Sequence, residues 1–313
     1  MFAYLLRRIL SAIPVMGIVA VFVFLLLRLT PGDPAAIIAG DHATPEQLER
    51  IRTTLGLNQP IWLQFVTWVG RLLQGDLGTS LISQIPVTEL IGRRLEPTLS
   101  LALMTITVSV LIAVPLGVAA AWRHRTWVDR FVMAFSVFGF SVPVFVVGYI
   151  LIQVFAIQLK WVPVQGYRSI TEGFGPFFDR AILPTFTLAS IYMALIARMT
   201  RASMLEVLGE DYVRTARAKG LNERTVLFGH ALRNAAVPVI TVIGTGFALL
   251  ISGVVVTESV FNIPGLGRLS VDAVLARDYP VIQGMILLTS ALYIAINLMI
   301  DIAYTLLDPR IRY

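Results

Sequence analysis

Few residues in this chain of 313 have the types and spacing that catalysis needs. The two lysines, Lys160 and Lys219, lie outside any Gly-x-x-x-x-Gly-Lys-Ser/Thr phosphate loop, so the chain lacks the Walker machinery that hydrolyses ATP. The three histidines, His42, His124 and His230, do not have metal-ligand spacing, and cysteine is absent. The Gly-x-Ser-x-Gly and His-Glu-x-x-His motifs of hydrolases are absent as well. We therefore expect a protein that is not an enzyme and that uses no metal or cofactor.

The composition indicates an integral membrane protein. Hydrophobic residues make up 57% of the chain and charged residues 14%, whereas soluble domains carry about 25% charged residues. A helix needs about 20 apolar residues to cross a bilayer, and six segments are long enough: 9–29, 98–122, 131–157, 181–199, 236–257 and 281–307. The first segment follows Arg7 and Arg8, but it is too long for a signal peptide and precedes no cleavage site. We expect an all-α membrane protein with six transmembrane helices, the first of them retained.

One carboxylate lies inside an apolar segment. Asp301 is six residues from the end of the last segment, about 9 Å at 1.5 Å per residue. An ionisable group within the membrane is by default a functional hypothesis. Proton-driven transport would need a carboxylate or histidine nearer the midplane, and none stands out. We expect Asp301 to pair with Arg198 or Arg201 instead.

Prolines fall inside three of the segments. Pro115, Pro143 and Pro184 are each expected to interrupt and kink a helix. Ser141 and Pro143 are candidates for lining a transport path, although helix packing explains them equally well.

The basic residues predict the orientation. With a cytoplasmic N-terminus, 14 of the 25 Lys and Arg residues fall in 60 inside positions, the segments 1–8, 123–130, 198–235 and 308–313. The other 11 are spread over 116 outside positions. This bias follows the positive-inside rule and predicts that both termini are cytoplasmic. It also accounts for the net charge of +6 without a nucleic-acid partner.

A polar interval between the fourth and fifth segments carries the clearest local signals. Residues 210–222 read Glu-Asp-Tyr-Val-Arg-Thr-Ala-Arg-Ala-Lys-Gly-Leu-Asn. Ser203 and Glu206 fit a capping box, so we expect a helix to start there. Gly220 can adopt the left-handed conformation that ends a helix, and Asn222 can cap the next one. The interval therefore predicts a helix, a sharp turn and a second helix.

Two kinds of partner fit the basic side chains of this interval, which are those of Arg214, Arg217 and Lys219. A protein that docks on the turn is one. Anionic membrane lipid is the other, because each basic residue near a lipid surface contributes about 1 kcal/mol. The interval by itself leaves both open.

The outside segment after the first apolar helix has helix signals of its own. Thr44-Pro45-Glu46-Gln47 combines an N-cap, a proline at the first helical position and a capping box, and Gly56 ends this helix. A second helix over 61–73 would place Trp62, Phe65 and Trp68 on one side, as expected along a membrane surface. Contact with a substrate-delivery protein and packing against the bundle explain these helices equally well.

The chain as a whole resembles the permeases of ABC importers for dipeptides, oligopeptides, glutathione or nickel. The cytoplasmic loop of that family has the core Glu-Ala-Ala-x-x-x-Gly; Arg214, Thr215 and Ala216 fill its first three places here, and Gly220 fills the last. An arginine in place of the opening glutamate is similar to the peptide and nickel branch. Further stretches that resemble the family run in order along the chain: 30–34, 55–60, 74–80, 94–99, 141–145, 161–163, 182–184, 255–268, 277–280 and 308–312.

The resemblance implies a type I ABC-importer permease bundle with a small periplasmic helical insertion after the first helix. It implies a subunit that forms half of a translocation pore in a bacterial inner membrane, beside a second homologous permease. Two cytoplasmic ATP-binding subunits and a periplasmic or lipid-anchored substrate-binding protein would complete the importer. Di- and oligopeptides are the cargo that it favours, and glutathione or nickel chelates stay open.

Residue roles follow from the same resemblance. The family's cytoplasmic loop is a coupling helix that enters a groove of the ATPase, which assigns coupling to Asp211, Tyr212, Arg214, Thr215, Ala216, Lys219, Gly220 and Leu221. The external gate lies near the loop after the fifth helix, which adds Phe261, Pro264 and Leu266 to Ser141 and Pro143 as pore or gate candidates. A short helix is expected just beyond, over 269–275.

The expected divisions of the chain are the first helix in 1–29, the periplasmic insertion in 30–97, and the permease core in 98–313 with its coupling loop at 201–235. Two other classes of protein remain open. A stand-alone secondary transporter would show inverted repeats, and no clear repeat is visible. A membrane enzyme would need converging polar residues, which the sequence does not indicate.

Overall fold

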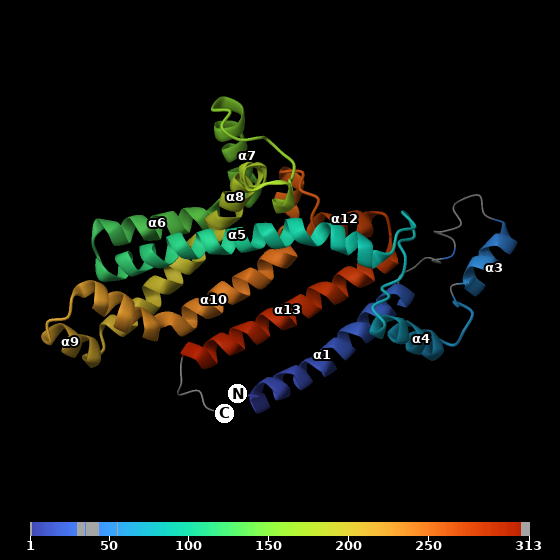
Figure 1. Ribbon diagram of the computed structural model, residues 1–313, viewed down its shortest axis with the longest axis horizontal. Helices are drawn as coiled ribbons and strands as arrows, with labels where there is room; N and C mark the ends of the chain where they lie inside the picture. The colour runs from blue at the N-terminus through green and yellow to red at the C-terminus, as the bar shows by residue number, and fades with distance from the viewer. Residues whose placement is uncertain (1, 30–34, 36–43, 55, 308–313) are drawn as a thin grey trace. The chain divides into compact units, whose positions relative to one another are not determined.

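The computed structural model describes residues 2–29, 35, 44–54 and 56–307, and every regular element in these ranges is a helix (Figure 1). The stretches 30–34 and 308–312, which resemble the importer permeases, lie outside the described residues. The chain divides into two compact units. The first comprises residues 1–95 and 268–294, and the second comprises 96–267 and 295–313.

The helices follow one another as α1 (Phe2–Leu29), α3 (Pro45–Thr54), α4 (Ile61–Leu73), α5 (Val87–Trp122), α6 (Trp127–Ser141), α7 (Val144–Leu151), η1 (Ile152–Gln158), η2 (Ile170–Glu172), α8 (Phe174–Leu208), α9 (Asp211–Ala218), η3 (Thr225–Ala231), α10 (Leu232–Gly253), α11 (Val255–Val260), α12 (Leu266–Leu275) and α13 (Tyr279–Leu307). Two of the short elements, η1 and η3, are π-helical, and η2 is a 3-10 turn.

In the first unit, α1 packs against α4 through aromatic rings. The ring of Phe24 stands edge-on to Phe65 at 5.2 Å between centroids and lies 5.7 Å from Trp68. The predicted helices over 45–54 and 61–73 are confirmed as α3 and α4. Gly56 has the left-handed φ of 67° that was expected to end the first of them.

The same unit holds a buried polar tie between two segments distant in sequence. The Ser80 hydroxyl donates to the Asp278 carboxylate at 2.5 Å, and the Leu81 N–H donates to its other oxygen at 3.1 Å. Asp278 is 5% exposed and directly precedes α13. The carboxylate therefore fixes the turn before α5 to the start of α13.

In the second unit, α8 is the central helix and packs against both α6 and α10 (Figure 1). Its buried residues Ala189, Met193 and Ile196 form a core with Ala120 of α5 and Val239 of α10. Small side chains let membrane helices approach closely, and this core is rich in them. This apolar core therefore holds α8, the helix that leads into α9, against its neighbours.

Among the described residues, five helices are long and apolar enough to cross a membrane, and there are six spans if α6 with α7–η1, which bend by 102°, count as one. The prediction of six apolar spans is confirmed, but the third is broken. Pro143 stands before the first residue of α7 and has no N–H to continue the α6 ladder. Pro115 and Pro184 lie inside continuous helices, so the prediction that they interrupt them is wrong.

The predicted helix start at Ser203 is also wrong. α8 runs without a break to Leu208, and Ser203 is buried. The next residue, Met204, is fully buried in a cluster with Val118 of α5 and Leu227 of η3. Packing of this helix face against two neighbours outweighs the local capping signal.

Candidate functional site

The helix α9 sits at the end of α8 as a short amphipathic element (Figure 1). Its inner side chains, Val213 and Ala216, are spaced three residues apart and are buried. They pack with Val226 of η3 against Val207 and Leu208 of α8. A small apolar underside thus anchors α9 to the two helices that flank it.

The turn after α9 has the geometry that the sequence predicts. α9 ends at Ala218, and Gly220 adopts a φ of 77°. The Asn222 carboxamide oxygen then accepts the Arg224 N–H at 3.1 Å, which caps the following helix. The expected turn and second helix are confirmed, whereas the first helix starts at Asp211 and not at Ser203.

Seven of the eight predicted coupling residues are exposed on this element, and the eighth, Ala216, faces inward. The exposed set is Asp211, Tyr212, Arg214, Thr215, Lys219, Gly220 and Leu221. Tyr212 and Leu221 leave 40% of their surface uncovered. The structure therefore brings the predicted residues together on one short element that combines basic and apolar side chains.

Two nearby residues escaped the sequence interpretation. Phe228 of η3 is 50% exposed, and the Asn234 amide donates to the Tyr212 hydroxyl at 2.8 Å. The wide turns of a π-helix change which side chains face outward, so α-helical periodicity does not place Phe228. Nothing in the sequence around Asn234 indicated its contact with Tyr212, which lies 22 positions earlier.

Ion pairs on the α9 element are at the surface. Arg214 lies 3.3 Å from Asp211, and Arg217 lies 2.7 Å from Glu223. The side chain of Arg214 is 73% exposed and that of Arg217 is 40% exposed. Exposed pairs contribute little to stability, so these charges remain available to another surface.

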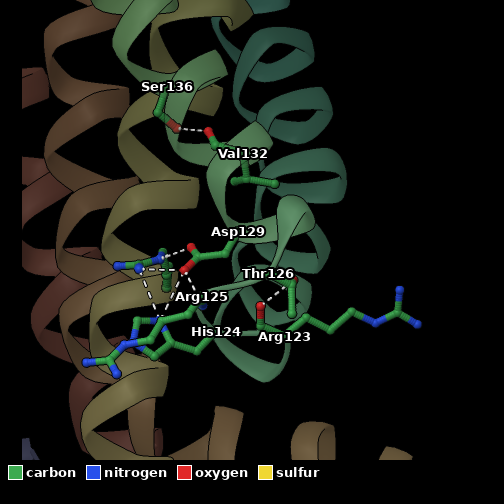
Figure 2. Close-up of polar contacts among 8 residues, drawn as sticks. Arg123, His124, Arg125, Thr126, Asp129, Val132 and Ser136 are labelled. Atoms are coloured by element: carbon green, nitrogen blue, oxygen red, sulfur yellow. Dashed lines mark hydrogen bonds and ion pairs between the residues drawn. The ribbon is translucent and has the colours of Figure 1, made fainter.

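A second polar cluster lies where α6 begins, at the same end of α8 (Figure 2). The Asp129 carboxylate accepts from Arg201 Nε at 2.5 Å and from Nη2 at 2.9 Å. It also accepts the Arg125 N–H at 3.0 Å and lies 3.1 Å from His124 Nδ1. Asp129 is almost fully buried. The four contacts satisfy a carboxylate that would otherwise be costly to bury.

This cluster corrects the expectation for Asp301. Arg201 pairs with Asp129, and the guanidinium of Arg198 lies over the Phe140 ring at 5.2 Å. Both arginines thus make contacts other than the predicted one, and Asp301 is buried in the last part of α13. The sequence interpretation overlooked Asp129 because it directly follows a charged turn and resembles a solvated residue.

The predicted gate residues differ in exposure. Phe261 and Leu266 are buried, whereas Pro264 between them is exposed. The Phe261 ring packs against Gly148 of α7, where an added Cβ would lie 3.3 Å from it. Ser141 and Pro143 are exposed at the bend between α6 and α7. The short helix expected over 269–275 is confirmed within α12.

A fully buried acid supports the segment that holds the predicted gate residues. Glu258 of α11 accepts from the Thr98 hydroxyl at 2.6 Å, and that hydroxyl accepts the Leu266 N–H at 2.8 Å. Thr98 is also fully buried and belongs to α5. The backbone of Gly265 lies against the Glu258 carboxylate. One side chain of α5 thus bridges both ends of the segment 258–266.

A loop on the same unit is held by another acid. Glu96 accepts from the Tyr167 hydroxyl at 3.2 Å, from the Ser169 hydroxyl at 2.6 Å and from the Ile170 N–H at 3.3 Å. Burial raises the pKa of the Tyr167 phenol to about 12. The phenol therefore stays protonated and keeps donating at any physiological pH.

The described residues contain no group of three or more His, Cys, Asp or Glu that could hold a metal ion. The arrangement is an exposed turn with basic and apolar side chains on a tightly packed helical frame. Such an element can bind and be displaced by a partner.

Comparisons with known proteins agree along the whole chain. Residues 113–313 match the family described as the binding-protein-dependent transport system inner membrane component, and residues 1–102 match the N-terminal family of these membrane components. The chain is 57% identical over 310 residues to a probable peptide ABC transporter permease of Sinorhizobium fredii, with 99% of each chain covered.

Two further relatives are similar over their full length. A putative peptide transport system permease of Brucella abortus is 47% identical over 313 residues, with 100% of each chain covered. The glutathione transport system permease of Salmonella typhimurium is 46% identical over 314 residues, again with 100% of each chain covered.

A solved structure of the MetNI methionine ABC transporter, in an inward-facing conformation, matches with a TM-score of 0.55 at 17% identity. The match covers 70% of this chain and 96% of that chain. At this identity it shows the fold alone, and it confirms the predicted importer-permease bundle.

Proposed function

The chain belongs to the inner membrane components of binding-protein-dependent transport systems, and we propose that it forms half of the pore of an ATP-driven importer for di- and oligopeptides. A second, homologous permease forms the other half. Two ATP-binding subunits dock on the cytoplasmic side, and an external substrate-binding protein delivers the cargo. This chain performs no catalysis, since the ATP is hydrolysed by its partners.

The observation that carries the proposal is the exposed turn formed by α9 and the start of η3. It presents basic side chains beside uncovered Tyr212, Leu221 and Phe228. Partly apolar surfaces with aromatic and arginine side chains are typical of protein interfaces. A surface that only met lipid headgroups would need the charges alone. The mixture supports docking of a protein on α9.

The proposed orientation follows the basic residues. Both termini and the α9 turn face the cytosol, where the ATP-binding subunits are. The exposed turn at 123–126 lies at the same end of the second unit as α9 and carries Arg123 and Arg125. Basic residues gather on the cytoplasmic side of membrane proteins, which supports placing both turns there.

The proposed mechanism is a displacement of α9. ATP binding draws the two ATP-binding subunits together, and α9 moves with the groove that holds it. Val213 and Ala216 pass this movement to the end of α8 because they are packed against it. The pore then alternates between two states whose affinities for the closed and open ATP-binding subunits differ. The segment 258–266 and the bend near Pro143 are the proposed gate elements.

Co-purification tests the proposal. The tagged chain is extracted from its native membrane in mild detergent, and the proteins that accompany it are identified by mass spectrometry. Recovery of a second permease and of ATP-binding subunits is expected. A stable chain that is recovered alone would contradict the importer and favour a self-sufficient transporter.

A matched pair of charge reversals tests the docking site. Arg214→Glu on α9 is expected to reduce the recovered ATP-binding subunits at least tenfold. Arg123→Glu, an exposed arginine outside α9, serves as the control and is expected to leave their recovery unchanged. Equal effects of both variants would mean that the basic residues serve lipid headgroups and not a docked subunit.

Glutathione is the second candidate cargo, because one full-length relative is named as a glutathione permease. Uptake of labelled dialanine and of labelled glutathione into vesicles with the complete importer separates the two. Uptake that dialanine saturates and glutathione does not inhibit is expected for a peptide importer, whereas the reverse would assign glutathione.

A further inference from the structure

We propose that Asp129 and Arg201 are positioning residues for transport: their buried ion pair makes α6 and the end of α8 move as one body when α9 is displaced. The inference rests on the proposed docking of ATP-binding subunits on α9. It assigns a role to two residues that belong neither to the docking surface nor to the gate candidates.

The geometry of the pair is that of a rigid clamp. The two guanidinium donors of Arg201, Nε and Nη2, each meet a different oxygen of Asp129, at 2.5 and 2.9 Å. The side chain of Asp129 is 6% exposed and that of Arg201 is 20% exposed. A two-pronged arginine–carboxylate pair fixes orientation as well as distance. Because the pair is largely shielded from water, its attraction is screened less than that of a surface pair.

On the α6 side, the carboxylate is fixed to its own turn. It accepts the Arg125 N–H, and Arg125 holds the left-handed φ of 64° in the turn that joins α5 to α6. It also contacts His124 of that turn at 3.1 Å. Asp129 lies in the first turn of α6, where the helix dipole favours a negative charge. Pulling on Asp129 therefore pulls on the start of α6.

On the α8 side, Arg201 is close to the contact with α9. It lies seven residues before Leu208, the last residue of α8, which is about 10 Å along the axis. Leu208 and Val207 pack against Val213 and Ala216 of α9. Any displacement of α9 reaches Arg201 through two turns of continuous helix.

A second contact holds the other end of α6. A Cβ on Gly139 would lie 2.9 Å from the carbonyl oxygen of Ser190, so the two helix backbones touch there. Asp129 of α6 contacts Arg201 of α8, and Gly139 of α6 contacts Ser190 of α8. The two helices are therefore antiparallel, with one contact near each end of α6. α6 ends at Ser141, where the span bends by 102°. Movement of the end of α8 is therefore transmitted through α6 to the bend after Ser141.

The test uses the complete importer reconstituted in liposomes, with Asp129→Asn and Arg201→Lys as two independent variants. Asn keeps the shape of the carboxylate and loses its charge; Lys keeps the charge and loses the two-pronged contact. The chain contains no cysteine, so spin labels at Val137→Cys on α6 and Phe186→Cys on α8 report one distance within it. Glu172→Gln is the matched control, since it removes the charge of an exposed pair with Arg168.

In the wild type and in the control, the label distance is expected to be the same with and without ATP and vanadate. In both variants it is expected to shift or broaden when ATP and vanadate are added. ATP hydrolysis should stay within twofold of the wild type, while uptake of labelled dialanine falls at least tenfold. This separation of hydrolysis from uptake is what a positioning role predicts and a purely structural role does not.

Unchanged distances and uptake in both variants would overturn the proposal. So would an equal loss of hydrolysis and uptake, or a failure of both variants to assemble with the ATP-binding subunits, because the pair would then serve folding alone. Failure of the proposed function is seen separately, as a wild-type chain that binds no such subunits.

Discussion

The turn after α9 and the turn after α11 each depend on a glycine, and the two glycines meet different needs. Gly220 has a φ of 77°, and no heavy atom lies within 4 Å of the position where a Cβ would stand. At Gly265 a Cβ would collide with the buried carboxylate of Glu258. Gly220 is required for its backbone conformation, and Gly265 for the space that it leaves.

The polar groups of the two turns differ in the same way. Around Gly220 the charged side chains form exposed or partly exposed pairs. Around Gly265 the acid Glu258 is fully buried and bonded to Thr98. The exposed charges of the first turn can still bind a partner, whereas the buried acid of the second turn forms its hydrogen bonds within the chain. Substitutions should therefore disturb function first at the α9 turn and stability first at the α11 turn.

Gly265→Ala is expected to have the largest effect on stability. The new methyl group overlaps the Glu258 carboxylate, and forcing extra volume into a packed site costs about 3 kcal/mol. Thermal melting of the purified complex measures it. Gly175→Ala is the control, because nothing lies within 4 Å of its Cβ position. Equal melting temperatures for the two variants would contradict the close packing of the Glu258 carboxylate against Gly265.

Thr98→Val is expected to come next. Valine keeps the volume but removes the hydroxyl that serves both Glu258 and the Leu266 N–H. Losing a buried hydrogen bond to a charged group costs about 2 kcal/mol. The same melting assay should also show recovery by Thr98→Ser, which retains the hydroxyl. A valine variant as stable as the wild type would show that Thr98 does not stabilise the segment 258–266.

Gly220→Val should affect coupling more than stability. A β-branched residue at this φ costs about 1–2 kcal/mol locally, and the distorted turn would no longer fit a docked subunit. We expect ATP hydrolysis to continue while uptake falls. Gly220→Asn, which tolerates the left-handed region, should retain most uptake. Normal uptake per ATP hydrolysed in the valine variant would argue against a coupling role for this turn.

Arg217→Ala is expected to have the smallest effect on stability. Its pair with Glu223 is partly exposed, and such pairs contribute about 0.2–1 kcal/mol. Melting of Arg217→Ala, Glu223→Ala and the double variant gives the coupling energy directly. A coupling energy several times larger would show that the α9 turn also depends on its charges for folding.

Local signals explain what the sequence could predict. The turn at Gly220 after α9 and the cap at Asn222 each depend on residues within a few positions of one another. The six apolar spans depend only on length and composition. The exposure of the predicted coupling residues followed from the polarity of their interval.

Contacts between distant residues explain what it could not predict. Arg201 and Asp129 are 72 positions apart, and Thr98 and Glu258 are 160 apart. Each acid is unremarkable in its own segment, and only the packing of the helices brings in its partner. The helix start wrongly expected at Ser203 has the same origin, since a buried helix face overrode a correct local pattern.

The bend between α6 and α7 also decides whether the number of membrane crossings before α9 is even or odd. With the bent pair counted as one crossing, the chain crosses six times, and α9 follows the fourth crossing. An even number returns α9 and the last helix end to the side of the N-terminus. If the bent pair entered and left by the same face, every element after Gln158 would be inverted and α9 would face the opposite compartment. Two short helices at an angle of 102° thus decide which compartment meets the proposed docking surface.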